Sequence, residues 1–308
     1  MQTSATPSIS ICICTFQRPQ ALSALLRSLQ NLVPSTPSSE VIVVDNDSER
    51  SAEPVVRQAI LEGQEIVYLV EPIQSIALAR NKSVHHARGE WLAFIDDDEE
   101  ADSRWLSELW RWVQAGNVDA AFGVVEHYFD PGTPDWLRVS YPAQKRISGG
   151  AVIWWDAATN NALVRRSMLL ELSELFDPVF GLTGGEDTDL FQRMFARGAL
   201  FVGVSSAIVR ERIPASRANA RYLIKWWLCA GAATGRIQQR VQQKRASARS
   251  IAAWPRIKRM VGSGLLGALC FYVSRVRALR YLCAAAFESG FVYYQLSGRL
   301  PLRYPKKV

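Results

Sequence analysis

The run Phe94–Glu100 (FIDDDEE) gathers the most chemically capable side chains of the sequence, because it places Asp96, Asp97 and Asp98 side by side. The run begins at the end of the short apolar segment Trp91–Ile95, which predicts a buried strand. Three adjacent carboxylates repel one another and need a cation or several backbone donors nearby. Carboxylate oxygens suit Mg²⁺ or Mn²⁺, ions that also bind substrate phosphates. The run therefore indicates a metal site, with a solvated acidic turn as the structural alternative.

A second acidic segment, Val41–Ser48 (VIVVDNDS), ends another apolar strand with Asp45 and Asp47. A carboxylate at a strand end can accept hydrogen bonds from a ribose or a base, as in dinucleotide sites. An Asx turn would use the same residues without any ligand. The segment is therefore a candidate for nucleotide binding, with the turn left open as an alternative.

The third segment, Gly184–Leu190 (GGEDTDL), carries Glu186 and Asp187 just ahead of a predicted helix. Paired glycines permit close backbone approach, and a helix N-terminus stabilises negative charge. A carboxylate held there could act as a general base beside an acceptor hydroxyl. Ordinary helix capping by Asp187 or Thr188 is the alternative.

The segments around these motifs predict alternating strands and helices. Strands are expected at Ser8–Cys14, Val41–Val44, Ile66–Val70, Trp91–Ile95, Ala120–Val125, Ala151–Trp155 and Asn160–Val164. Helices are expected at Ala21–Leu32, Val55–Glu62, Ile76–Ala87, Trp105–Val113 and Leu190–Arg197, and a long loop at Tyr128–Gly150. The alternation predicts an α/β fold with a mostly parallel sheet flanked by helices. Ligands of such sheets bind beyond the carboxyl ends of the strands, where two of the acidic motifs fall.

Four segments in this order and spacing, ICICTFQRP, VVDNDS, ARNKSVHHARGEWLAFIDDDEE and GGEDTDL, resemble the family 2 glycosyltransferases of GT-A fold. The resemblance covers roughly Ile9 to Gly235. The run AIVRERIPASR is similar to the subgroup that builds bacterial exopolysaccharides, of the succinoglycan glucosyltransferase type. The resemblance implies inverting transfer of a sugar from a nucleotide-diphosphate sugar, with a UDP-sugar expected, to a saccharide or lipid-linked acceptor. It also implies Mn²⁺ or Mg²⁺ as cofactor.

The resemblance also implies roles for individual residues. Nucleotide binding falls to Thr15, Phe16, Arg18, Asp45, Asp47, Arg80 and Asp97. Asp96 and Asp98 match the two ends of the family's DxD motif and are the implied metal ligands, Asp98 the direct one. Asp187 matches the catalytic base, with Glu186 in support. The base would take a proton from the acceptor hydroxyl as it attacks the anomeric carbon opposite the leaving diphosphate.

One departure from the family concerns the metal. Many relatives carry a further metal-binding His shortly after the acidic motif, but the matching residues 208–211 here read Ile-Val-Arg-Glu. Either the metal binds more weakly, or Glu211 or Arg210 acts at the diphosphate instead. The three histidines of the sequence, His85, His86 and His127, are expected to be structural or solvated.

The C-terminal part of the chain is strongly basic. Residues 210–308 hold 20 Lys/Arg and 2 Asp/Glu, a net charge of +18, whereas residues 1–209 have a net charge of −11. Helices are expected at Tyr222–Gly231, Ile237–Ala248 and Val261–Ser297. Basic helices with short apolar stretches favour an anionic membrane surface as partner. A packed subdomain with a solvated basic face is the alternative, and no motif indicates nucleic acid.

The expected location is the cytoplasm, peripheral on the inner face of the cell membrane. No signal peptide is visible, and the uncharged stretch Met260–Ser274 is too short to cross a bilayer. The five cysteines form no zinc or CxxC pattern and suit a reducing compartment. The expected domains are a GT-A catalytic domain at 1–220, binding nucleotide at about 1–125 and acceptor at about 126–220, and a basic helical region at 221–308.

Two other functions are alternatives to sugar transfer. A nucleotidyltransferase could use a similar sheet, but the loop after the first strand lacks a glycine-rich phosphate-binding run. A non-catalytic scaffold of a polysaccharide assembly complex is the second alternative. It would have no reason to retain the like-charge repulsion of Asp96–Asp98 and Glu186–Asp187.

Overall fold

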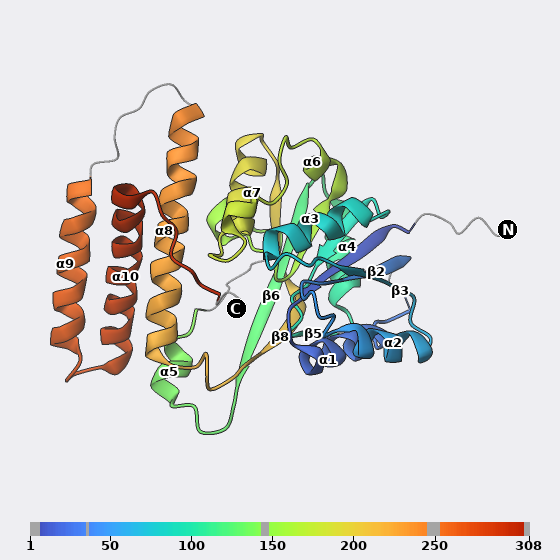
Figure 1. Cartoon of the computed structure of the whole chain (residues 1–308), viewed down its shortest axis with the longest axis horizontal. Helices are drawn as coiled ribbons and strands as arrows, with labels where there is room; N and C mark the ends of the chain where they lie inside the picture. Colours follow the sequence, from blue (N-terminus) through green and yellow to red (C-terminus); the bar gives the residue numbers. More distant parts are fainter. Residues whose placement is uncertain (1–6, 35–36, 143–147, 245–252, 305–308) are drawn as a thin grey trace. The chain divides into compact units, whose positions relative to one another are not determined.

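The computed structural model describes residues 7–34, 37–142, 148–244 and 253–304 (Figure 1). Contacts between the residues divide the chain into two units. The first comprises Met1–Tyr128, Ala143–Gly181 and Glu186–Arg212, and the second comprises Phe129–Pro142, Leu182–Gly185 and Ile213–Val308.

The first unit is built on an eight-stranded sheet of order β3-β2-β1-β4-β7-β6-β8-β5. Its strands are β1 (Ile9–Thr15), β2 (Ser39–Asp45), β3 (Ile66–Val70), β4 (Trp91–Phe94), β5 (Glu99–Ala101), β6 (Ala120–Phe129), β7 (Ala162–Arg165) and β8 (Phe201–Ile213). Strand β1 pairs in parallel with β2 and β4, and β2 with β3. The pairs β4–β7, β6–β7 and β5–β8 are antiparallel. The parallel part brings the ends of β1, β2 and β4 to one edge of the sheet.

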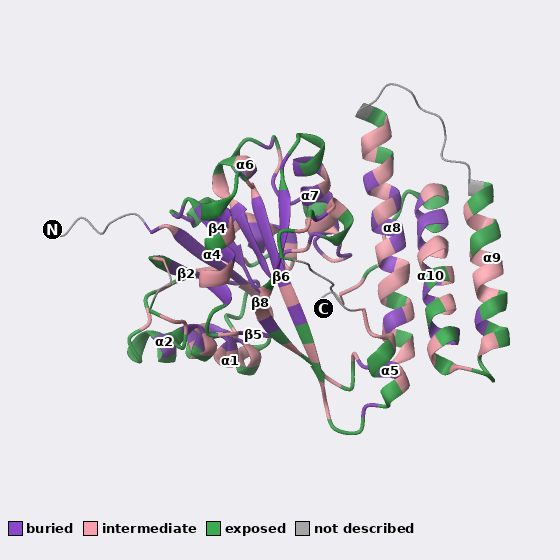
Figure 2. Ribbon diagram, turned by 180° about the vertical axis from the view of Figure 1, so that it is seen from behind, coloured by how far each residue is buried: buried purple, intermediate pink, exposed green. Residues whose placement is uncertain are grey.

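Helices cover both faces of this sheet and bury its apolar side chains (Figure 2). They are α1 (Pro19–Gln30), α2 (Glu53–Leu61), α3 (Ile76–His86), α4 (Trp105–Ala115), α6 (Arg166–Leu170) and α7 (Glu186–Ala196). One core joins the strands to α1, α2 and α4, and a second core joins them to α3, α6 and α7. The predicted α/β fold with flanking helices is therefore confirmed.

Local sequence explains why the helices begin where they do. Pro19 occupies the first turn of α1, where a missing N–H costs nothing. The leucines of α1 at helical spacing are all buried. In α3, the side chain of Ser75 caps the helix by accepting a bond from the Leu78 amide at 3.3 Å. This cap fixes the start of the helix that carries Arg80.

The second unit consists of α5 (Asp135–Ser140), α8 (Ala220–Lys244), α9 (Ala253–Cys270) and α10 (Arg275–Ser297). Helix α10 packs against α8, α9 and α5. Its beginning is capped by Ser274 and its end by Gly298 in the left-handed region, with φ 65°. The predicted basic helical region after the catalytic fold is thus present. None of these described helices is long and apolar enough to span a membrane.

Several expected elements differ from the observed ones. The expected strand Ala151–Trp155 is only a single bridge from Ala151 to Val202, followed by the 3₁₀ turn Trp154–Asp156. Strand β8 was not expected, and the expected loop after Tyr128 contains α5. These segments mix polar and apolar residues without a clean period, so tertiary pairing decides their structure.

The C-terminal helices also differ from expectation. One continuous helix, α8, replaces the two expected at Tyr222–Gly231 and Ile237–Ala248, although residues 245–248 lie outside the described part. Conversely, the expected helix Val261–Ser297 is divided into α9 and α10 by a turn at Phe271–Ser274. Small and apolar residues continue through this turn, so hydrophobic periodicity gave no signal of the break.

Candidate active site

The loops after β1 and β4 meet through hydrogen bonds to the acidic triplet. Thr15 Oγ1 donates to Asp97 Oδ2 at 2.8 Å. Arg18 Nη1 donates to Asp97 Oδ1 at 3.0 Å and to Asp98 Oδ2 at 2.9 Å. Burial raises the pKa of Asp97 to about 7, against the lowering effect of the Arg18 charge. Because β1 and β4 are parallel neighbours, their ends deliver these groups to the same place.

Arg80 joins the acidic triplet to the third motif. Its guanidinium Nη2 donates to Asp96 Oδ1 at 3.1 Å, and its Nη1 donates to Glu186 Oε1. Arg80 lies on α3 and Glu186 begins α7, on the same face of the sheet. Two carboxylates from segments far apart in the sequence therefore share one buried cation.

Asp187 lies next to this cluster and is only partly buried. Its Oδ1 accepts bonds from the Thr188 amide at 2.7 Å and the Thr188 hydroxyl at 3.3 Å. Gly184 and Gly185, just before it, have φ angles of 75° and 100°. Since side chains other than glycine are strained there, the paired glycines of the motif serve the turn that leads into α7.

Asp45 and Asp47 form a separate group in the loop after β2. Asp45 is fully buried, and its Oδ2 accepts bonds from the Ala52 amide at 2.8 Å and the Tyr68 hydroxyl at 2.9 Å. Its Oδ1 accepts a bond from the Asp47 amide at 3.1 Å. In this conformation Asp45 holds the loop together. Its predicted hydrogen bond to the nucleobase of a donor stays a prediction. Phe16 follows β1 directly and is partly exposed.

Sequence reasoning did not single out Glu99, which is 1% exposed. Its Oε2 accepts a bond from the Asp96 amide at 2.9 Å, whereas its buried Oε1 has no hydrogen-bond partner among the described residues. The register of β5 and β8 sets Glu99 opposite Glu211. Burial, and then the charges of Asp96 and Glu211, raises the pKa of Glu99 well above its ordinary value.

His127 on β6, which was expected to be structural or solvated, is the second residue near the cluster that sequence reasoning did not select. Its Nε2 lies 3.2 Å from Glu211 Oε2, and both side chains are mostly buried. The pair became visible only with the strand register, since Glu211 stands on a strand that periodicity did not predict. Glu211, one of the two residues considered above for a role at the diphosphate, thus has the imidazole of His127 beside its carboxylate.

The donor set of this cluster fits a divalent cation. Asp96 and Asp98 provide hard carboxylate oxygens, which suit Mg²⁺ or Mn²⁺. No group of three or more metal-ligating side chains within the described part of the chain is already arranged around a metal position. Such an ion needs only one or two protein carboxylates when substrate phosphates and water complete its shell.

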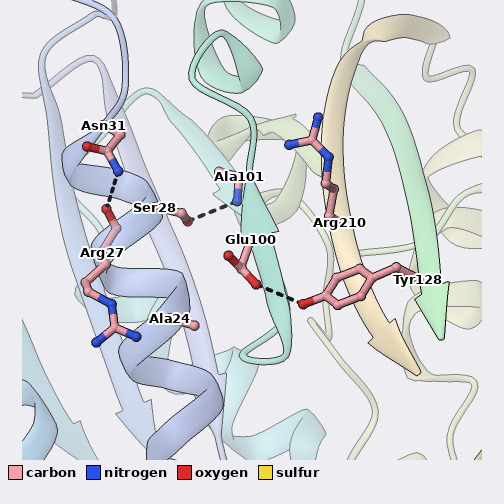
Figure 3. A pocket seen from close by; sticks show the side chains of 8 residues that line it. All are labelled: Ala24, Arg27, Ser28, Asn31, Glu100, Ala101, Tyr128 and Arg210. Atoms are coloured by element: carbon pink, nitrogen blue, oxygen red, sulfur yellow. Dashed lines mark hydrogen bonds between the residues drawn. The ribbon is translucent and has the colours of Figure 1, made fainter. Parts of the chain in front are cut away.

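A separate hollow of about 650 Å³ lies between α1 and the strands β5, β6 and β8 (Figure 3). It is lined by Ala24, Arg27, Ser28, Asn31, Glu100, Ala101, Tyr128 and Arg210. The Tyr128 hydroxyl donates to Glu100 Oε1 at 2.9 Å across it. Successive residues of a strand point to opposite faces, so Glu100 faces this hollow and Glu99 faces the acidic cluster. Among the residues that the sequence connects with the site, only Arg210, the alternative to Glu211, lines the hollow.

The fold is similar to that of a solved glycosyltransferase. That protein is the mannosyltransferase PcManGT from Pyrobaculum calidifontis, solved in complex with GDP-Man and Mn²⁺, and the TM-score is 0.57. The likeness covers 93% of this chain and 88% of that one, at 17% identity. At this identity the likeness shows the fold alone, and the predicted GT-A fold is confirmed.

Sequence comparison then gives the family. The model of glycosyl transferase family 2 matches residues 10–173. The chain is 32% identical over 310 residues to the succinoglycan biosynthesis protein ExoM of Rhizobium meliloti, covering 97% of this chain and 94% of that protein. A Campylobacter jejuni GalNAc(5)-diNAcBac-PP-undecaprenol beta-1,3-glucosyltransferase is 30% identical over 112 residues, 36% of each chain. The chain therefore belongs to glycosyltransferase family 2, as its motifs predicted.

Proposed function

We propose that this chain is a metal-dependent, inverting hexosyltransferase that uses a nucleotide-diphosphate sugar, with a UDP-sugar expected. One observation carries the proposal: Arg80 links Asp96 of the acidic triplet to Glu186 of the motif that ends in Asp187. Groups suited to the leaving diphosphate and to the attacking hydroxyl thereby lie within one cluster. The Campylobacter relative, which is named a glucosyltransferase, and the solved mannosyltransferase in complex with GDP-Man support the same chemistry.

The donor is assigned to the loops after β1, β2 and β4. Thr15, Phe16 and Arg18 would contact the nucleotide, and the bonds of Thr15 and Arg18 to Asp97 hold them in position. Arg18 is half exposed and could therefore turn toward a diphosphate when a donor binds. Asp45 and Asp47 are still assigned to bind the nucleobase of the donor. This assignment requires the loop after β2 to rearrange.

Asp96 and Asp98 would hold the cation, Asp98 directly. When bound, Mn²⁺ or Mg²⁺ would neutralise charge on the departing diphosphate. The complex of the similar mannosyltransferase with Mn²⁺ supports this assignment. Arg80 keeps a positive charge beside Asp96 and limits the mutual repulsion of the carboxylates.

Asp187 is assigned as the general base, with Glu186 in support. The base must meet an acceptor from solvent, and Asp187 is only partly buried while Glu186 is buried. Proton removal by Asp187 would activate the acceptor oxygen for attack on the anomeric carbon. The diphosphate would leave from the opposite face, so the configuration inverts. The positive charge that develops on the sugar in the transition state would resemble that of glycoside hydrolysis.

The acceptor is assigned as a saccharide, carried on a polyprenyl diphosphate, in cell-surface polysaccharide synthesis. The name of the Campylobacter relative, which includes an undecaprenol-linked acceptor, supports this class. A lipid-linked acceptor stays in the bilayer, so the protein would work peripherally on the cytoplasmic face of the membrane. Donor binding is assigned to about 1–125, acceptor binding to about 126–220 and membrane association to 221–308.

A donor screen tests the proposal. Purified protein is incubated with UDP- and GDP-sugars and Mn²⁺ or Mg²⁺, and release of nucleotide diphosphate is measured with and without a lipid extract as acceptor. Release from one donor, dependent on the metal and stimulated by the extract, is expected. No release from any donor under either metal, in a protein that binds none of the nucleotides, would overturn the proposal.

A further inference from the structure

Helix α9 is partnered on one side only. It packs on α10, where Gly267 lies against Leu282, and α8 lies on the other side of α10 (Figures 1 and 2). The outer side of α9 contacts no other described helix closely. Gly262 and Gly264, for example, have no atom within 4 Å of the position that a Cβ would take.

The outer face of α9 is apolar. Trp254, Val261, Leu265 and Leu269 are all exposed, and Tyr272 follows in the turn at 93% exposure. Their spacings of three, four and seven residues place them along one side of the helix. Lys258 is also exposed in this row, between Trp254 and Val261. Large exposed side chains gathered along one side of a helix mark a binding surface rather than scattered surface residues.

The charges around this face are of one sign. Residues 213–308 contain a single acid, Glu288. Arg256 Nη1 and Arg259 Nε bind its two carboxylate oxygens at 2.8 and 3.0 Å. Lys258 is exposed on α9 beside Trp254, with its Nζ 5.6 Å from the ring centroid. The only acid is thus already paired with two cations, and the surroundings of the apolar row are cationic.

The first two turns of α10 add Arg275, Arg277 and Arg280, all exposed. A helix dipole disfavours cations at the N-terminus, so nothing within the helix explains their presence there. They flank the exposed turn at Phe271–Val273. Anionic groups outside the protein would offset both the dipole and the mutual repulsion of the arginines.

We infer that the outer face of α9 and the turn after it insert into the headgroup region of an anionic lipid bilayer, with α9 lying in the membrane plane. A row of apolar side chains bordered by Lys and Arg is the pattern of an interfacial helix. A second copy of the chain fits less well, because its identical face would bring cations against cations. The inference specifies the membrane contact of the proposed function and rests on that function for its biological purpose.

The test measures flotation of the full-length protein with vesicles of phosphatidylcholine containing one third phosphatidylglycerol. Flotation is expected at low salt and is reduced but not abolished at high salt, because salt screens charge and not apolar insertion. The variant Leu265→Asn/Leu269→Asn should bind at least about tenfold more weakly. Trp254→Phe should remove the part of the tryptophan emission that brominated lipids quench.

A matched control keeps the test specific. Leu61→Asn/Ile73→Asn removes two side chains of similar exposure, 82% and 62%, from the first unit and should bind vesicles like the unaltered protein. All variants should release nucleotide diphosphate from a donor in water at the unaltered rate. Loss of that release with normal flotation would count against the transferase assignment and not against this surface.

Three results would overturn the inference. The first is that the unaltered protein does not float with anionic vesicles at low salt. The second is that the α9 variant and the control bind vesicles equally well. The third is that the unaltered protein forms dimers that Leu265→Asn/Leu269→Asn dissociates, without binding vesicles, which would make the face an interface between copies.

Discussion

Arg80 donates a hydrogen bond to Glu186, and the two side chains are only 8% and 7% exposed. The same guanidinium bonds Asp96 at 3.1 Å. A buried ion pair contributes little when both partners are present, but the removal of one partner leaves an uncompensated charge. Arg80 is therefore the group on which the folded arrangement of two acidic motifs depends.

We predict that Arg80→Met lowers the free energy of unfolding by about 3–5 kcal/mol, because Glu186 keeps a buried charge without its cation. The double variant Arg80→Met/Glu186→Gln should be more stable than Arg80→Met alone, since both charges are gone. Urea unfolding measures each value. Arg18→Met is the control, because Arg18 is 44% exposed and its loss should cost about 1 kcal/mol or less. Equal effects at both arginines would contradict the assigned dependence.

The parallel half of the fold could be predicted from the sequence because its apolar residues recur at regular helical or strand spacing. Leu22, Leu25, Leu26 and Leu29 mark one side of α1, and all four are buried. Strand β8 could not be predicted, because Ser205, Arg210 and Glu211 interrupt its apolar alternation. The C-terminal part of β8 pairs with β5, which is a long-range contact that local sequence does not reveal.

The candidate site likewise has one part that the sequence predicts and one part that it does not. The meeting of Thr15 with Asp97 follows from parallel neighbours, whose ends share one edge of the sheet. The approach of Glu99 to Glu211 depends instead on the register of an antiparallel pair, which no local pattern specifies.

The assignment of the cation gives the second prediction. Asp98→Asn should abolish transfer while the circular dichroism and the unfolding midpoint stay close to those of the unaltered protein, because Asp98 is a carboxylate at the edge of the cluster. An excess of EDTA should do the same reversibly, and added Mn²⁺ should restore activity. Full activity in excess EDTA would exclude the metal assignment.

The third prediction concerns the base. Asp187→Asn keeps the shape of the side chain and removes the proton acceptor, so turnover should fall by at least about 10²-fold. Nucleotide binding, measured by calorimetry, should be nearly unchanged because donor contacts are assigned to other loops. Thr188→Ala serves as a milder companion, since it removes only the hydroxyl bond to Asp187 Oδ1. Lost donor binding with normal turnover at saturation would show that Asp187 has a different role.

Glu40 on β2 gives a prediction of pH dependence away from the candidate site. Burial acts to raise its pKa, but bonds from Ser10 and Arg88 and the Arg88 charge outweigh burial and lower the pKa below 4.5. Ser10 Oγ donates at 2.6 Å and Arg88 Nε at 2.8 Å. A depressed folded-state pKa contributes stability above the unfolded pKa, and this stability is lost as the pH falls through the folded pKa.

Glu40→Gln should therefore lower the free energy of unfolding by about 1–3 kcal/mol at neutral pH. The difference from the unaltered protein should shrink as the pH falls below 4.5, where the native carboxylate itself becomes protonated. Urea titrations between pH 7 and about pH 3 measure it. Glu90→Gln is the control: Glu90 is 69% exposed, so its effect should be small at every pH. A difference for Glu40→Gln that is constant with pH would contradict this account.

The last prediction concerns the contact between α8 and α10 in the second unit. A Cβ at Gly231 would overlap the carbonyl oxygen of Phe287, and a Cβ at Gly290 would overlap that of Leu228. Both obstacles are backbone atoms, which cannot rotate away. Gly231→Ala should therefore force the helices apart and destabilise their contact by about 1–3 kcal/mol.

Gly262→Ala on α9 is the control. Its Cβ meets no atom within 4 Å, and the substitution should stabilise its helix by up to about 1 kcal/mol. Hydrogen exchange of the α8 and α10 amides measures the effect locally: exchange should become faster in Gly231→Ala and stay unchanged in Gly262→Ala. Equal protection of α8 and α10 in both variants would mean that the two helices do not need the close approach at Gly231.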